Sequence, residues 1–290
     1  MRYVVMRMAG GLGNQLFQYA AGLALSKARG ARLLLDATSY RLDKLRTYAL
    51  EPFALTPQFV PRPFVPLMAA FDKRYVGRIL RTVLPGAGWH CVRDRSQGYE
   101  PDRFPPRGNL VLEGYWQTDK YFAGVANEVR AAFAFRDPPD EANAQCLARI
   151  SRGPAVAVHV RRGDYVTNPS ANAVHGTCGP EYYRAAAEVV GRTAPDANYF
   201  VFSDDPDWAE QHLTWPGPTE VVRHNLGRRD ADDLRLMAAC DHFIIANSSF
   251  SWWGAWLATN PHKVVVAPRR WFATDQLTDR DQTPVDWLRV

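Results

Sequence analysis

Cysteines are few, and no apolar run is long enough to cross a membrane. The four cysteines are scattered, none forms a CxxC pair, and no histidine lies at zinc-finger spacing, which argues against a structural zinc site. Scattered cysteines fit a reducing compartment. No stretch approaches the roughly 18 apolar residues of a membrane span, and the N-terminal residues become polar too early for a signal peptide. We therefore expect a cytoplasmic protein, peripheral at the inner membrane if it contacts a membrane.

Lysine is also scarce, because 30 of the 35 basic residues are arginine. Genome base composition explains such a bias, and so does recognition of phosphate by the planar guanidinium group. The net charge of +5 suits a phosphate-bearing ligand, an acidic polymer or a membrane surface without selecting one. With 290 residues, 47% of them hydrophobic, the chain has room for one large globular domain or two ordinary ones.

The N-terminal part predicts a strand, a turn, a helix and a second strand. Residues 3–8 are apolar and lead into the glycine-rich turn 10–13. A helical pattern follows over 14–29, Gly30 is a suitable stop, and 31–35 read as the second strand. Such a unit usually builds a parallel sheet.

The middle of the chain is rich in proline. Residues 52–110 predict irregular structure with short helices. Within them, 73–83 form an amphipathic pattern, typical of a surface helix packed on its own core or of a helix lying on an anionic membrane. A helix with proline in its first turn is predicted to start in 137–144, and a domain boundary near residue 150 follows. We expect two domains, one over 1–150 and one over 151–290.

The C-terminal part alternates between apolar runs and helical patterns, which predicts a doubly wound α/β domain. The expected strands are 155–160, 199–203, 221–224, 242–246 and 263–267, and the expected helices are 181–192, one from 206, 230–240 and one from 251.

Polar residues follow three of these strands. They are Arg161 to Asp164, Ser203 to Asp205, and Asn247 to Ser249. Because ligands of such sheets bind at the carboxyl ends of the strands, near the switch point, the three loops predict a binding cleft.

The first loop follows His159 and contains Arg161, Arg162, a glycine and Asp164. Two guanidinium groups match phosphate oxygens, and Asp164 is suited to holding one of them or accepting a proton. The alternative is a structural Arg–Asp pair at a strand end. His159 alternates with apolar neighbours, as a packed core histidine does.

The second signal is a serine-rich helix start in residues 246–258. Free N–H groups and hydroxyls at a helix start form an anion site. The tryptophans Trp252, Trp253 and Trp256 lie in the first turns of this helix, where core packing is the default interpretation. Asp205 and Asp207 form a DxD, a pattern that holds a divalent metal in some sugar transferases, although the intervening proline favours helix capping by Asp204 or Asp205.

The N-terminal glycine turn invites a dinucleotide-binding interpretation but departs from the pattern. The position of the third glycine is Leu16, although Asp36 lies at the distance expected of a ribose-binding acid. The turn either brings the backbone close to a ligand, with Asn14 and Gln15 pointing toward it, or is purely structural.

Taken together and in order, these motifs resemble the bacterial branch of glycosyltransferase family 11, the α-1,2-fucosyltransferases. The blocks are GGLGNQLFQYA, GYWQTDKYF, HVRRGDY, FSDD and ANSSFSWWGAWLA, and they span nearly the whole chain. The resemblance implies a GT-B-like fold of two Rossmann-like domains facing a cleft, with 1–150 as the acceptor-side domain and 151–290 as the GDP-sugar-binding domain. It also implies GDP-fucose as donor, inversion at the anomeric carbon, and no required metal or other cofactor.

The resemblance also assigns residues. Arg161 is expected to bind the diphosphate with support from Arg162 and Asp164, and Asn14 to approach the reacting centre. Asp164 and His159 are the candidates for a general base. The rest of the nucleotide site is expected to comprise His159, Ser203, Asp204, Asp205, Asn247, Ser248, Ser249, Phe250 and Ser251. Tyr115, Trp116 and Gln117 are expected to face the acceptor, a glycan that is lipid-linked or free, with terminal galactose as the expected target.

Three other functions stay open at this stage. A metal-dependent GT-A transferase would use the DxD, and an NAD-dependent oxidoreductase would use the N-terminal glycine turn. A non-catalytic module would bind anionic glycans or nucleic acid, but the arginines form no continuous basic run interleaved with aromatics, and we expect no nucleic-acid partner.

Overall fold

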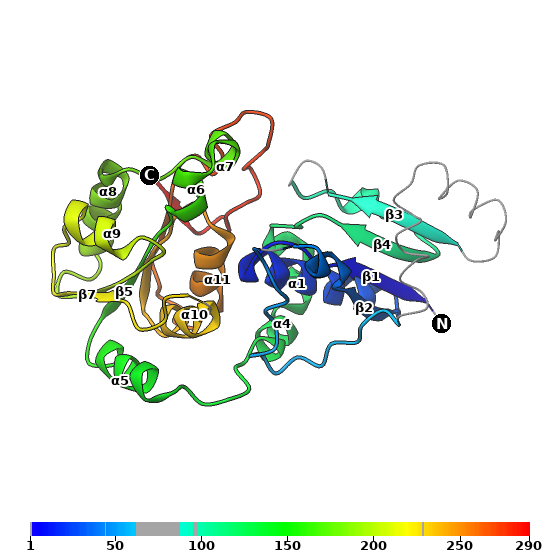
Figure 1. The fold of residues 1–290 in the computed structure, drawn as a ribbon, viewed down its shortest axis with the longest axis horizontal. Helices are drawn as coiled ribbons and strands as arrows, with labels where there is room; N and C mark the ends of the chain where they lie inside the picture. Colours follow the sequence, from blue (N-terminus) through cyan, green and yellow to red (C-terminus); the bar gives the residue numbers. More distant parts are fainter. Residues whose placement is uncertain (1, 44, 62–87, 95–97, 228) are drawn as a thin grey trace. The chain divides into compact units, whose positions relative to one another are not determined.

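The computed structural model describes residues 2–43, 45–61, 88–94, 98–227 and 229–290, and it contains two α/β units (Figure 1). Unit 1 is Met1–Arg136 and unit 2 is Asp137–Val290. The amphipathic helix predicted over 73–83 lies outside the described residues. No helix in the described ranges is long and apolar enough to cross a membrane.

The units divide earlier than the boundary predicted near residue 150. Helix α5 (Glu141–Ile150) belongs to unit 2, because its side chains bond to that unit. Arg149 forms a bidentate ion pair of 2.7 Å with Glu220, and the Asn143 amide donates to Asn225 Oδ1 at 3.0 Å. Asp140 caps α5 by accepting from the Asn143 N–H, so the prolines predicted in its first turn precede the helix instead.

Unit 1 contains a parallel sheet with strand order β2-β1-β4-β3. Its strands are β1 (Tyr3–Arg7), β2 (Arg32–Asp36), β3 (Trp89–Arg93) and β4 (Asn109–Glu113). Its helices are α1 (Leu12–Ala28), α4 (Ala126–Ala132) and the 3-10 turns η1 (Thr38–Arg41), η3 (Pro101–Arg103), η4 (Asp119–Tyr121) and η5 (Ala123–Val125).

The β1-α1-β2 segment confirms the predicted β-turn-α-β unit. Helix α1 starts at Leu12, two residues before the prediction, and Gly30 follows its end with φ of +55°, a left-handed conformation that glycine adopts without strain. The prediction for 52–110 was wrong in part, because β3 and the start of β4 lie within it. The many prolines around them favoured an irregular structure, and each of the two strands is only five residues long.

Unit 2 contains a parallel sheet with strand order β10-β9-β8-β5-β6-β7. The strands are β5 (Ala155–Val160), β6 (Asn198–Ser203), β7 (Thr219–Val222), β8 (His242–Ile244), β9 (Val265–Ala267) and β10 (Leu288–Arg289). The helices besides α5 are α6 (Gly163–Thr167), α7 (Pro169–His175), α8 (Pro180–Gly191), α9 (Pro206–His212), α10 (Asp230–Ala238) and α11 (Ser249–Leu257). The sequence predicted neither α6, α7 nor the two-residue strand β10.

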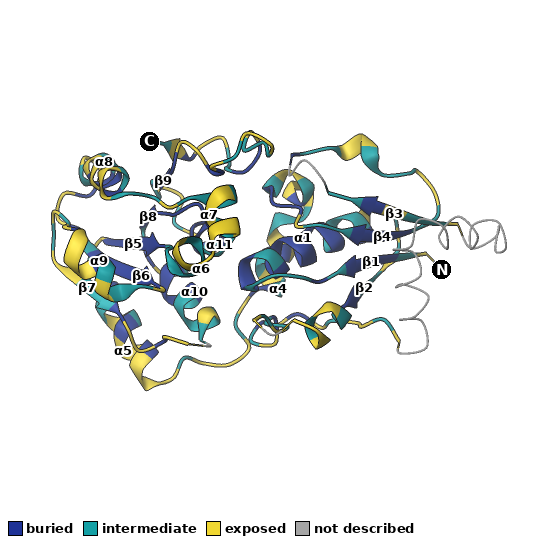
Figure 2. Ribbon diagram, turned by 45° about the horizontal axis from the view of Figure 1, so that its top comes forward, coloured by how far each residue is buried: buried dark blue, intermediate teal, exposed yellow. Residues whose placement is uncertain are grey.

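The sheet of unit 2 is buried on both faces, as the continuous apolar strands predict (Figure 2). Val156, Val158 and Val160 of β5 pack with α8 residues such as Tyr183. Side chains alternate along a strand, so His159 points to the opposite face, where its ring lies 5.4 Å from that of Phe250 in α11. Helices thus cover both faces, and the predicted doubly wound domain is confirmed.

Candidate functional site

The three polar loops predicted from the sequence end neighbouring strands. Strand β5 lies between β8 and β6, and all three run parallel. From β5 the chain adds β6 and β7 on one side of the sheet, and it then adds β8, β9 and β10 on the other side. The switch point therefore falls between β5 and β8. Loops after these strands therefore flank the position where open α/β sheets bind their ligands.

Arg161 is held by carboxylates from two of these loops. Its guanidinium pairs with Asp164, one turn further along the chain, and with Asp204 at 2.8 Å, beyond the end of β6. The side chain is 23% exposed, so it is ordered by the protein but still open to solvent. Burial lowers the pKa of Arg161, but the charges of Asp204 and Asp164 outweigh it and hold that pKa above its ordinary value. Arg161 is a fixed cation.

Arg162 shares the Asp204 carboxylate with Arg161 and also contacts Asp205. Its backbone N–H donates to Asp204 at 2.8 Å, and its Nε donates to Asp205 at 3.1 Å. Its guanidinium carbon lies 3.9 Å from the ring centre of Trp208, a cation–π distance. Ser203 supports this loop by accepting from the Asp205 N–H at 2.9 Å. Arg161, Arg162, Ser203, Asp204 and Asp205 therefore form one cluster.

Gly163 packs closely against the Asp204 carboxylate of this cluster. A Cβ at this position would lie 2.3 Å from Asp204 Oδ2, far inside contact distance. The glycine in the RRGD loop therefore lets the β5 loop approach the β6 loop closely enough for Asp204 to reach both arginines.

His159 is buried beside this cluster. It is 5% exposed, and its Nδ1 has no hydrogen-bond partner among the described residues. Burial, and then the charge of Arg161, lower the pKa of His159 to about 3. The imidazole is therefore neutral at pH 7, which makes it a weak base and a suitable hydrogen-bonding group. The ring is packed in the core, as the core-histidine interpretation predicted, and it faces the start of α11.

The start of α11 divides the predicted phosphate-binding residues into two groups. Ser248 caps the helix by accepting from the Phe250 N–H at 3.3 Å, and Ser249 and Phe250 are partly exposed. In contrast, Ser251 is fully buried, and its hydroxyl donates to the Ala246 carbonyl.

Asn247 also has a structural role. It is 3% exposed, and its amide donates to the carbonyls of His175 and Trp271 at 2.7 and 3.2 Å. The hydrogen bonds of Asn247 and Ser251 are directed into the protein, so these side chains shape the loop. Ser248 is buried as well, whereas Ser249 and Phe250 are partly exposed.

The tryptophans of α11 are core residues, as predicted. Trp252 and Trp253 are fully buried, and Trp256 is 7% exposed. The Trp252 indole donates to the Gln282 carbonyl at 2.8 Å, which fixes the C-terminal segment to this helix.

The DxD carboxylates have other partners. Asp205 caps α9 by accepting from the Trp208 N–H at 3.3 Å, as the capping interpretation predicted. Asp207 pairs with Arg223 at 2.7 Å. Within the described part of the chain, no group of three His, Cys, Asp or Glu side chains is arranged to hold a metal ion.

A hydrogen bond within unit 1 fixes the side chain of Asn14, the residue expected at the reacting centre. The Gln117 amide donates to Asn14 Oδ1 at 2.7 Å, which joins the first and second sequence blocks of the resemblance. Gly10 has φ of +77°, and a Cβ there would lie 2.5 Å from Asn14 Nδ2, so the turn requires glycine. One of the two interpretations of the glycine turn had Gln15 pointing toward a ligand. Gln15 is instead fully buried, and it bonds to the backbone of Gly10, Thr47 and Ala49.

Trp116 was also expected to face the acceptor, and that expectation was wrong. The side chain is 1% exposed and packs against Phe104 and Tyr121. Trp116 has φ of +56°, an unusual conformation for a bulky residue. Tyr115 is 37% exposed. Gln117 is 8% exposed and contacts Asn14.

Sequence reasoning missed two aromatic contacts of the arginines and one unusual acid. Tyr165 lies 5.3 Å from the Arg161 guanidinium and stacks on His175 at 4.6 Å. Trp208 contacts Arg162, as described above. Asp233 in α10 accepts from Asn225 at 3.0 Å, and burial raises its pKa to about 7. Tyr165 lies close to Arg161 in the sequence, so that contact was visible there. The contact of Trp208 with Arg162 and the burial of Asp233 depend on packing between distant segments.

Comparison with known proteins agrees with this arrangement. The model of the family described as Glycosyl transferase family 11 matches residues 95–290. An α-1,2-colitosyltransferase of Escherichia coli is 32% identical, over 100% of this chain and 99% of its own length. The O-antigen biosynthesis glycosyltransferase WbnK of Escherichia coli is 30% identical, over 92% of this chain and 94% of its own length. Human galactoside α-(1,2)-fucosyltransferase 1 is 27% identical, over 86% of this chain and 64% of its own length.

Solved structures share the fold at low sequence identity. A variant of Arabidopsis thaliana FUT1 in complex with GDP matches with a TM-score of 0.59 and 14% identity, over 98% of this chain and 74% of that one. The α-1,6-fucosyltransferase NodZ co-crystallised with GDP matches with a TM-score of 0.50 and 15% identity, over 89% and 92%. The predicted GT-B-like α/β class is confirmed. With a family model covering more than half of its length, the chain belongs to glycosyltransferase family 11.

Proposed function

We propose that this glycosyltransferase moves L-fucose from GDP-fucose to O2 of a terminal galactose on a glycan acceptor, with inversion at the anomeric carbon. The observation that carries the proposal is the cluster of Arg161, Arg162 and Asp204 at the switch point, beside the start of α11. The α-1,2-fucosyl and α-1,2-colitosyl relatives support the reaction, and the GDP named with two structures of this fold supports the donor.

The arginines suit a leaving diphosphate. A guanidinium group carries five N–H donors. Asp164 and Asp204 each engage one terminal nitrogen of Arg161, so further donors stay available for phosphate oxygens. Because the carboxylates fix the guanidinium before the ligand binds, little reorganisation is needed as negative charge develops on the diphosphate.

The other parts of the site assist this cluster. The partly exposed start of α11, at Ser249 and Phe250, adds the positive end of a helix dipole for the phosphates. The neutral His159 would position the donor through its unpartnered Nδ1 rather than act as a base. Asp164 is the better candidate to accept the proton of the attacking hydroxyl. Asn14 is assigned to the reacting centre from its place in the GLGNQ block and its bond to Gln117.

No metal ion is needed for this chemistry, because two arginines and a helix start supply the positive charge. The carboxylates of the DxD alternative are engaged in a helix cap and an ion pair. We further propose that the enzyme acts in the cytoplasm at the inner membrane surface on a lipid-linked glycan, in keeping with the O-antigen assignment of one relative. Recovery of the enzyme in the outer membrane or periplasm would contradict this location.

A second donor is favoured by the colitosyltransferase relative. Colitose is L-fucose without its 3-hydroxyl group, so GDP-colitose would present the same diphosphate to Arg161. The two donors would differ only in contacts to that hydroxyl, and a site that hydrogen-bonds a hydroxyl discriminates strongly against an analogue that lacks it.

The test is an assay of the purified enzyme with GDP-fucose, GDP-colitose and UDP-galactose, using lactose as a β-galactoside acceptor, with and without EDTA. We expect transfer from a GDP-sugar that is insensitive to EDTA, and a product whose α-1,2 linkage is visible by NMR. Loss of transfer with EDTA would favour the metal-dependent alternative. Transfer from UDP-galactose alone, or a product with the donor's own β configuration, would overturn the proposal.

A further inference from the structure

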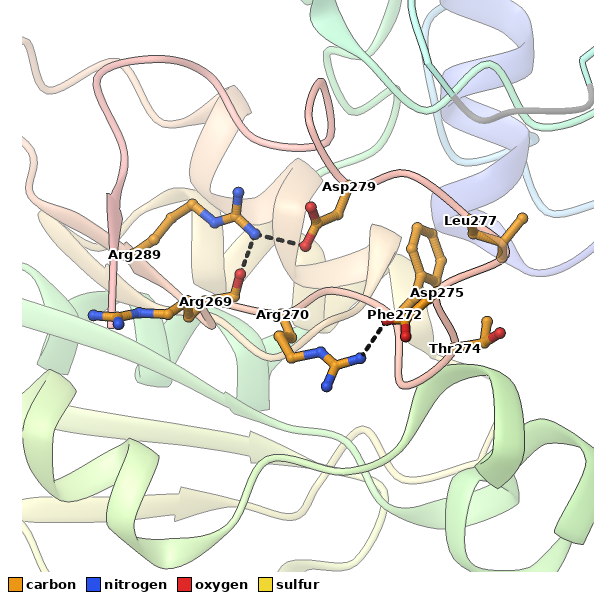
Figure 3. Close-up of a pocket in the computed structure, with 8 residues that line it drawn as sticks. All are labelled: Arg269, Arg270, Phe272, Thr274, Asp275, Leu277, Asp279 and Arg289. Carbon is orange, nitrogen blue, oxygen red and sulfur yellow. Dashed lines mark hydrogen bonds and ion pairs between the residues drawn. The ribbon is translucent and has the colours of Figure 1, made fainter.

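A pocket of about 360 Å³ lies at the outer side of the carboxyl edge of the unit 2 sheet, separate from the arginine cluster (Figure 3). It is formed by the segment 269–279, which follows β9, and by Arg289 of β10. Its volume falls within the range of small-molecule sites. All of its lining residues belong to one unit, and none belongs to the predicted nucleotide site.

Two ion pairs form the polar part of the pocket. Arg289 donates to Asp279 at 2.7 Å, and Arg270 donates to Asp275 at 2.9 Å (Figure 3). Each pair presents carboxylate acceptors and guanidinium donors side by side. An inorganic anion in this space would meet two carboxylates, whereas a sugar hydroxyl both donates and accepts and can use both members of each pair.

Apolar side chains complete the lining. Leu277 and the largely buried Phe272 are the apolar residues of the lining. A pyranose ring has the same mixed character, because its hydroxyls project from the edge and its C–H groups form apolar patches on the faces. The chemistry of the pocket therefore fits a neutral saccharide better than a phosphate or a purely apolar ligand.

A chain of packed side chains links the pocket with the arginine cluster. The Phe272 ring lies 5.9 Å from that of His175, which stacks on Tyr165, which in turn lies 5.3 Å from the Arg161 guanidinium. The segment is also tied to α7 by a hydrogen bond of 2.9 Å from the Ala273 N–H to the Val174 carbonyl. The pocket and the proposed nucleotide site are thus neighbours on one edge of the sheet that share no residue.

We propose that this pocket is an acceptor subsite that holds a sugar unit of the glycan next to the unit that receives the transferred sugar. The role of the pocket as an acceptor subsite rests on the proposed function, whereas saccharide binding rests on the pocket alone. Such a subsite places an acceptor recognition element in unit 2.

The test uses Asp275→Ala and Arg270→Ala, because these side chains are 99% and 64% exposed and their loss leaves the core intact. Arg223→Ala is the matched control, since Arg223 is another surface arginine of unit 2 with carboxylate partners. Amide resonances of 269–279 are followed by NMR in the full-length protein, with lactose, methyl β-galactoside and inorganic phosphate as probes, each with and without GDP.

We expect lactose to shift the amides of 269–279, with binding weakened at least about fivefold by either pocket variant and unchanged in the control. Saturating GDP should leave these shifts in place. No saccharide-induced shift in this segment, or a response to phosphate alone, would overturn the proposal. Displacement of lactose by GDP would overturn it as well, because the pocket would then be part of the donor site.

The two proposals can fail separately. If lactose shifts the pocket amides but no sugar is transferred from any GDP-sugar, the saccharide site stands and the reaction is wrong. If transfer occurs and the pocket variants have the acceptor KM of the control, the reaction stands and the subsite is wrong.

Discussion

Replacing Arg161 tests the centre of the proposed mechanism. In Arg161→Ala, the departing diphosphate loses a fixed guanidinium, and the carboxylates of Asp164 and Asp204 that held it are left facing the developing negative charge. Loss of one preorganised donor to a developing oxyanion typically costs about 10²–10³ in rate, roughly 3–4 kcal/mol. A charged side chain that is only 23% exposed should be worth at least that much, so we expect kcat to fall at least about 100-fold.

The stability of the fold should change far less. Asp204 keeps its hydrogen bond from the Arg162 N–H, and partly exposed ion pairs contribute about 0–1 kcal/mol each. Thermal unfolding without ligand should therefore be near that of the wild type, whereas the increase in Tm produced by GDP should be largely lost. These two measurements separate a damaged site from a damaged fold.

Arg223→Ala is the control for this comparison. Arg223 also pairs with two carboxylates, Asp207 and Glu210, but it lies outside the arginine cluster. Its removal should change turnover by no more than about twofold, as for most surface substitutions. If Arg161→Ala turns over as fast as Arg223→Ala, the assignment of Arg161 to the diphosphate is refuted.

Three other predictions concern the cap, the core and one buried acid. Asp205→Ala should lower the free energy of unfolding by about 0.5–2 kcal/mol, because the α9 cap is lost. Asp207→Ala should keep near-normal sugar transfer that is insensitive to EDTA, because Asp207 only pairs with Arg223. Loss of activity in Asp207→Ala would instead support a metal site at the DxD. Trp252→Ala should cost about 3–5 kcal/mol in urea unfolding, because the buried indole also bonds to Gln282, and a cost below about 1 kcal/mol would contradict its place in the core. Burial raises the pKa of Asp233 to about 7, so the folded state retains a proton that the unfolded state releases above about pH 4. The stability of the fold should therefore fall as pH rises from about 4 to 7 and then level off. Asp233→Asn should remove this dependence in Tm measurements from pH 5 to 8.

Local patterns determined much of the fold. The apolar run at 155–160 predicted β5 to the residue, and the proline at 206 marked the first residue of α9. Alternating strands and helices imply parallel pairing, so the three polar loops could be placed on one edge of a sheet before the order of its strands was known. These features depend on periodicity and turn chemistry, which act within a few residues of the chain.

Tertiary packing decided what the side chains at that edge do. The contacts of Asp204 and Asp205 with the two arginines join positions more than 40 residues apart, and no local pattern specifies such pairs. The inward hydrogen bonds of Ser251 and the burial of Trp116 likewise depend on neighbouring segments.

The short strand β3 and the assignment of α5 to unit 2 show the same limit on a larger scale. A five-residue strand among prolines carries too weak a local signal to be recognised, and it is stabilised by pairing with β4. Helix α5 belongs to unit 2 because Arg149 and Asn143 bond to that unit. The sequence by itself determined the type of site and the residues at its edge. Only the tertiary structure decided which of those residues are held open to a ligand, because burial and ion pairing arise between segments that meet only when the chain is folded.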